Sequence, residues 1–110
     1  MSVVKLIADS GATKAEWCLL NNGRKKTIFT QGISPYFLNT EQIYQLLEAE
    51  LKPVLRKEEI HEIYYYGTGC ANPTNALSVK KAISRSFKGA KVEVTHDLMG
   101  AARDNFAVSA

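Results

Sequence analysis

The chain has 110 residues, 45% of them hydrophobic, which is enough for one domain with a hydrophobic core but short for an enzyme that encloses two substrates. Its 14 basic and 11 acidic residues are scattered and leave a formal net charge of +3, so neither nucleic acid nor a membrane surface is indicated as a partner. The two cysteines, Cys18 and Cys70, are far apart, which excludes a disulfide framework and a CxxC zinc site and favours a reducing, cytoplasmic location.

The first third of the chain predicts a three-stranded antiparallel meander. Residues 3–8 form an apolar run that is typical of a strand buried on both faces and is too short for a signal peptide or a membrane span. Residues 14–20 alternate as a second strand, and Asn22-Gly23 then favours a type I′ turn. Residues 26–30 supply the return strand.

The middle of the chain predicts an amphipathic helix. Asn39 and Gln42 are spaced as a capping pair at its start. Pro53 should kink or end its last turn, because proline lacks the amide proton and its ring clashes one turn back. One apolar stripe follows the cap and consists of Ile43, Leu46, Leu47, Leu51, Val54 and Leu55.

The last part of the chain predicts a strand, a helix and a strand. Residues 60–66 are rich in aromatic and branched side chains, as strands are. Asn72-Pro73 is typical of an N-cap followed by the first helical residue, Gly89 ends that helix, and residues 91–95 alternate as a short strand. The full order of elements predicts a mixed sheet whose last two strands run parallel to the first.

The turn between the first two strands is the strongest candidate for chemistry. Gly11 would let the backbone approach an oxyanion closely, and the hydroxyls of Ser10 and Thr13 can donate hydrogen bonds to it. Asp9 can hold a hydrated magnesium ion, and Lys14 adds positive charge nearby. The alternative is an ordinary hairpin, because these are common turn residues and the spacing of a Walker A loop is absent.

Asp97 is the second candidate, because it directly follows a strand and precedes the small residues 100–102 at the start of an expected helix. Open α/β sheets bind ligands at this end of their strands, where a carboxylate can accept a proton from a hydroxyl. A helix N-cap explains the aspartate equally well. The residues Gly67, Thr68 and Gly69 either line the same cleft or form a plain strand-to-helix turn.

Together, the motifs DSGATK at residues 9–14, GTG at 67–69 and HDLMGAA at 96–102 resemble the N-acetylglucosamine kinase-like proteins, in the BadF-BadG-BcrA-BcrD ATPase family of the actin-like ATPase and sugar kinase superfamily. The resemblance covers essentially the whole chain. It implies a ribonuclease-H-like α/β fold, with a mixed five-stranded sheet and flanking helices. Relatives are more than twice as long, and the segment 106–110 ends in apolar sequence. We therefore expect residues 1–110 to be the N-terminal domain of a two-domain protein, inactive without its C-terminal domain.

The resemblance also implies functions for individual residues. Residues 9–14 correspond to the loop that binds the phosphates of ATP, with Mg²⁺ held by Asp9 through water. Asp97 corresponds to the general base. Ser34 lies where relatives contact the sugar, often through an asparagine, and Thr68 and Gly69 are further expected substrate contacts.

The implied activity is transfer of the γ-phosphate of ATP to an amino sugar such as N-acetylglucosamine, although the serine at position 34 leaves the sugar open. The expected partners are ATP, the sugar, the missing C-terminal domain and, in a homodimer, a second copy of the chain. One alternative is an actin-like ATPase that activates a partner of the 2-hydroxyacyl-CoA dehydratase type. A filament-forming or binding module of actin-like type is the other.

Overall fold

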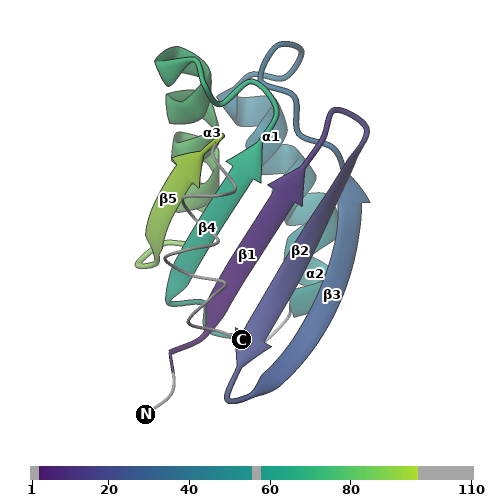
Figure 1. Ribbon diagram of the computed structural model, residues 1–110, viewed down its shortest axis with the longest axis vertical. Coiled ribbons are helices and arrows are strands. Elements are labelled where there is room, and N and C mark those ends of the chain that lie inside the picture. Colours follow the sequence, from purple (N-terminus) through teal and green to yellow (C-terminus); the bar gives the residue numbers. More distant parts are fainter. Residues whose placement is uncertain (1–2, 56–57, 97–110) are drawn as a thin grey trace.

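A five-stranded mixed sheet forms the centre of the protein, seen in a computed structural model that describes residues 3–55 and 58–96 (Figure 1). Its strands are β1 (Lys5–Ser10), β2 (Lys14–Asn21), β3 (Arg24–Gln31), β4 (Glu62–Gly67) and β5 (Lys91–Thr95). They lie in the order β3-β2-β1-β4-β5. The first three strands pair antiparallel, whereas β4 runs parallel to β1 and β5 runs parallel to β4. The predicted mixed sheet is therefore confirmed, and its topology is that of a ribonuclease-H-like fold.

The β2–β3 connection has the predicted tight turn. Asn22 and Gly23 have φ angles of 53° and 82°, the left-handed values that a type I′ turn requires at both central positions. The pairing of Asn21 with Arg24 follows directly from this two-residue loop. The hairpin therefore sets the register between β2 and β3.

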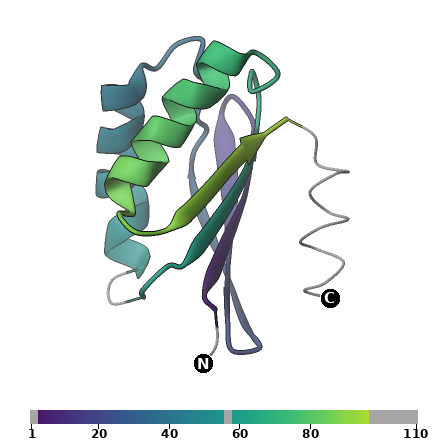
Figure 2. The same ribbon diagram turned by 90° about the vertical axis from the view of Figure 1, so that its left-hand side faces the viewer.

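Alternation along the strands divides their side chains between two faces of the sheet. The helices of the described residues cover one face (Figure 2). On that face Trp17 is fully buried, with its ring centroid 6.0 Å from that of Tyr65 and its Nε1 donating to Thr30 Oγ1 over 3.0 Å. Tyr64 and Tyr66 point to the opposite face and are buried in a smaller cluster with Ile7.

The first helix is interrupted by a π turn. It consists of α1 (Thr40–Leu46), the π turn (Leu47–Leu51) and α2 (Lys52–Leu55), which ends near Pro53 as predicted. The predicted capping box is present, since the Asn39 side chain accepts from the Gln42 amide and the Gln42 side chain accepts from the Asn39 amide. A π turn just before Pro53 widens the backbone where the proline ring would otherwise clash with the preceding turn.

The π turn also changes which side chains face the sheet. Four buried residues follow at intervals of four, namely Ile43, Leu47, Leu51 and Leu55. In a regular α-helix, positions four apart rotate by about 40° relative to one another, so such a series would leave the core. The extra residue of the π turn takes up that rotation. Val54, expected on the buried stripe, is instead 40% exposed, so that prediction was wrong.

The second long helix, α3 (Pro73–Ser86), begins and ends as its sequence predicts. Asn72 Oδ1 accepts from the amides of Thr74 and Asn75, and Gly89 follows the helix with a φ of 90°. The helix expected after Asp97 lies outside the described residues. Within residues 3–55 and 58–96, no helix is long and apolar enough to cross a membrane.

Candidate functional site

A pocket of about 450 Å³ lies at the carboxyl ends of β1 and β4. Its walls come from the end of β1, the loop before α1, the turn after β4 and the residue after β5. They consist of Asp9, Ser10, Gly11, Tyr36, Tyr66, Gly67, Thr68, Gly69, Ala71 and His96. Because β1 and β4 are adjacent and parallel, the sheet brings residues 9–11 and 67–69 together although they are distant in the sequence.

The turn after β1 is closed by one backbone hydrogen bond, from the Gly11 amide to the Lys14 carbonyl oxygen over 2.9 Å. The amides of Ala12 and Thr13 donate none of the backbone hydrogen bonds that hold the turns and loops of the described residues, and both residues are exposed. Gly11 does not have a left-handed φ. A Cβ there would meet nothing nearer than Lys14 O at 3.6 Å, so the space beside its backbone is open.

Asp9 is an exposed carboxylate on the face of the sheet opposite the helices. It lies between Glu16 of β2 and Tyr66 of β4 in the strand register and lines the pocket. Within the described residues, no group of three or more His, Cys, Asp and Glu side chains could hold a metal ion. A single carboxylate suits Mg²⁺, which keeps several water ligands and usually binds phosphate oxygens as well.

Ser10 is placed differently from the phosphate donor expected for it. Its side chain points toward the helices and is 3% exposed. Its Oγ accepts from the Ile33 amide over 2.9 Å and donates to the Gly11 carbonyl oxygen over 3.1 Å. Since the single hydroxyl proton is already used, this geometry gives Ser10 a structural role: it ties the loop before α1 to the turn after β1.

Gly32 does not line the pocket but packs against the turn after β1, a contact that the sequence did not predict. A Cβ on Gly32 would lie 2.4 Å from Gly11 O and 2.5 Å from the Ala12 carbonyl carbon. Only glycine allows the loop to pass this close to the turn. A glycine two residues after the predicted strand at 26–30 was the available signal, but the sequence does not show which backbone it approaches.

The turn after β4 forms the second wall of the pocket. The Thr68 amide donates to the Ser10 carbonyl oxygen over 3.0 Å, which holds the ends of β4 and β1 together. Gly69 has a φ of 82° and packs against Tyr36. Burial raises the pKa of the neighbouring Cys70 thiol to about 11, which disfavours the reactive thiolate at neutral pH.

Three further predicted site residues, Thr13, Lys14 and Ser34, are not among the residues that line the pocket. Thr13 and Lys14 are exposed and do not line it, and the Lys14 ammonium lies 4.7 Å from the centroid of the Phe29 ring. Ser34 is 5% exposed, and its Oγ has no hydrogen-bond partner among the described residues. Asp97, the expected general base, lies outside the described residues, although the preceding His96 lines the pocket.

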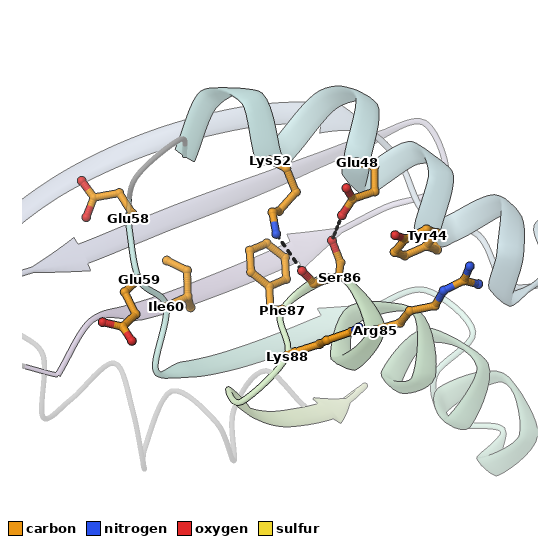
Figure 3. A pocket seen from close by; sticks show the side chains of 10 residues that line it. All are labelled: Tyr44, Glu48, Lys52, Glu58, Glu59, Ile60, Arg85, Ser86, Phe87 and Lys88. Atoms are coloured by element: carbon orange, nitrogen blue, oxygen red, sulfur yellow. Dashed lines mark hydrogen bonds between the residues drawn. The ribbon is translucent and has the colours of Figure 1, made fainter.

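A second pocket, of about 410 Å³, lies between the first helix and the end of α3 (Figure 3). Two hydrogen bonds join the helices at this pocket: Lys52 Nζ donates to the Ser86 carbonyl oxygen over 2.7 Å, and Ser86 Oγ donates to Glu48 Oε2 over 2.6 Å. The Lys52 ammonium also lies 4.9 Å from the centroid of the Phe87 ring. These groups join two helices, and none of the motifs singled out in the sequence lies in this pocket, so it is the weaker candidate.

No known protein family matches the sequence, and no curated protein matches it. Among solved structures, the chain is similar to YeaZ from Pseudomonas aeruginosa, with 17% sequence identity and a TM-score of 0.47. The alignment covers 96% of this chain and 50% of YeaZ, so the chain spans about half the length of that protein. The order and directions of the strands define a ribonuclease-H-like domain.

Proposed function

We propose that the chain is the N-terminal domain of an ATP-dependent sugar kinase that phosphorylates a hydroxyl of an amino sugar such as N-acetylglucosamine. The observation that carries the proposal is the pocket at the carboxyl ends of β1 and β4, which brings Asp9 and Gly11 together with Thr68 and Gly69. These residues belong to motifs at 9–14 and 67–69 that resemble sugar kinases, and in the sequence they are more than fifty residues apart.

The turn after β1 is suited to binding phosphate. In the proposed complex, the amides of Ala12 and Thr13 donate to phosphate oxygens, and Gly11 leaves the space through which they approach. Asp9 holds a water ligand of Mg²⁺, and the bound ion neutralises charge on the phosphates. Ser10 keeps the turn in place through its bonds to Ile33 and Gly11.

The proposed general base is Asp97, which follows the pocket-lining His96 in the sequence. Its carboxylate would accept the proton of the attacking sugar hydroxyl, and the domain would contribute mainly by positioning the sugar and the phosphates. The adenosine pocket and the second phosphate loop are assigned to the C-terminal domain. The isolated domain should therefore bind ATP weakly, since half of the nucleotide cleft is absent.

The test is ADP release by the complete two-domain protein, measured with N-acetylglucosamine, with glucose and without sugar. The proposal expects sugar-dependent release, and Asp97→Asn should lower turnover by roughly 10²–10⁴. Its melting temperature should not change, because asparagine caps helices about as well as aspartate. ADP release that ignores every sugar would instead favour a partner-activating ATPase, and wild-type turnover by Asp97→Asn would exclude the base assignment.

A further inference from the structure

The loop between β3 and α1 carries an aromatic side chain into the rim of the candidate site. Tyr36 lines the pocket and is 65% exposed, whereas its neighbour Phe37 is 82% exposed and does not line it. The two consecutive aromatic residues thus differ in whether they line the pocket. Of this pair, only Tyr36 can offer its ring to a ligand bound at the carboxyl ends of β1 and β4.

A packing contact with Gly69 and the backbone hydrogen bonds of the surrounding loop hold Tyr36 in position. A Cβ on Gly69 would lie 2.9 Å from Tyr36 Cε2 and 3.1 Å from Pro35 Cγ, so the ring rests on a backbone segment that has no side chain. The φ of 82° at Gly69 also requires glycine for conformational reasons. In the loop, Ser34 O accepts from the amides of Phe37 and Leu38 over 3.0 and 2.9 Å, which fixes the backbone around Tyr36.

The pocket walls combine the apolar surfaces of Tyr36, Tyr66 and Ala71 with several polar groups. Asp9, Thr68 and His96 provide polar side chains, and the glycine residues provide exposed backbone. A sugar ring has matching chemistry, with hydroxyl groups around its edge and C–H groups on its faces. Aromatic rings pack on such C–H faces, while polar groups bind the hydroxyls and fix the orientation.

We propose that Tyr36 packs its ring against a C–H face of the acceptor sugar and is a main determinant of sugar affinity. This inference rests on the proposed kinase function and adds the residue that selects the acceptor. The contact is made in the ground state and in the transition state alike, so its loss raises the KM for the sugar and leaves kcat nearly unchanged. The hydroxyl of Tyr36 is not needed for it.

The experiment compares three variants of the complete protein with N-acetylglucosamine as the acceptor. Tyr36→Ala should raise the sugar KM about tenfold and leave the KM for ATP unchanged. Tyr36→Phe should keep the wild-type sugar KM because the ring is retained. Phe37→Ala is the matched control, since it removes a more exposed ring outside the pocket and should change neither constant. Melting curves of all variants check folding.

A binding measurement that does not depend on turnover accompanies the kinetics. Saturation-transfer NMR of N-acetylglucosamine with the wild-type protein should show the strongest transfer to the C–H protons of one ring face, and Tyr36→Ala should remove that preference. An unchanged sugar KM in a folded Tyr36→Ala variant would overturn the inference. So would an equal loss in Tyr36→Phe, which would assign the effect to the hydroxyl.

The outcomes also separate this inference from the proposed function. If the wild-type protein turns over sugar but Tyr36→Ala behaves like Phe37→Ala, only the role of Tyr36 is wrong. If Tyr36→Ala raises the KM for ATP and not for the sugar, the ring packs on the nucleotide, and the inference fails while the kinase survives. If no sugar supports ADP release by the wild type, the kinase proposal and the sugar contact both fail.

Discussion

Replacing Gly32 with alanine tests whether the close contact between the loop before α1 and the turn after β1 organises the candidate site. The new Cβ would lie 2.4 Å from Gly11 O, about 1 Å short of the 3.4 Å at which ordinary contact begins. The carbonyl carbon and oxygen of Ala12 follow at 2.5 and 2.6 Å. All three are backbone atoms, so no change of rotamer can relieve the contact, and the two segments must separate.

The cost of this separation has two parts. Overpacking in a closely packed region costs roughly 1–3 kcal/mol. Moving the loop away also lengthens the 2.9 Å bond from the Ile33 amide to the buried Ser10 Oγ, and a lost hydrogen bond costs about 1 kcal/mol more. The free energy of unfolding should fall by roughly 2–4 kcal/mol, which lowers the melting temperature by at least about 8 °C in a domain of this size.

Gly11→Ala is the matched control in the same contact. Its Cβ would meet nothing nearer than Lys14 O at 3.6 Å, and the φ of Gly11 is not left-handed. The substitution should therefore leave stability unchanged or raise it by about 0.4–1 kcal/mol, because alanine restricts the unfolded chain. Thermal unfolding followed by circular dichroism compares the two variants. A Gly32→Ala protein that melts within about 2 °C of the wild type would refute the reasoning.

Three further substitutions or reactions test other parts of the site. Ser34→Ala should leave the melting temperature and the sugar KM unchanged, because the buried Oγ has no hydrogen-bond partner in the described part of the chain and Ser34 does not line the pocket. A raised sugar KM would instead support the expected direct contact between Ser34 and the sugar. Gly69→Ala should cost roughly 1–2 kcal/mol in unfolding experiments, since it forces alanine to a φ of 82° and into the Tyr36 ring; a neutral result would contradict the described packing. Iodoacetamide should alkylate Cys70 slowly at pH 8 in the native protein and readily in urea, because burial raises the thiol pKa to about 11, and fast native alkylation would contradict the burial. Because the buried thiol favours the folded state while it is protonated, the free energy of unfolding should decline as pH rises past the ordinary cysteine pKa toward 11.

Local sequence was sufficient to predict the elements and their order. The Asn22-Gly23 turn, the Asn39–Gln42 capping box and the Asn72 cap each depend on residues within four positions of one another, so their geometry can be inferred without the rest of the chain. Strand directions follow from connection lengths, because a two-residue loop joins antiparallel neighbours and a helical crossover joins parallel ones. Strand β5 has the predicted bounds, 91–95. Strands β1 and β4 begin at Lys5 and Glu62, two residues later than the predicted starts at 3 and 60.

The candidate site was predicted only in part, for a physical reason. The motifs identified Asp9, Gly11, Thr68 and Gly69, and parallel pairing of β1 with β4 accounts for their meeting in one pocket. No local rule shows how a side chain is used once distant segments pack against it. The direction of a strand residue follows from alternation, but its bonding partner does not.

The sequence by itself thus determined the architecture, because periodicity, caps and turns are short-range properties of the chain. Only the tertiary structure decided that the Ser10 hydroxyl bonds Ile33, that Gly32 passes against the Gly11–Ala12 backbone and that Tyr36 rests on Gly69. These contacts join residues about 20 to 33 positions apart. They depend on which backbone segments the folded sheet brings together, and side-chain type alone does not determine which segments meet.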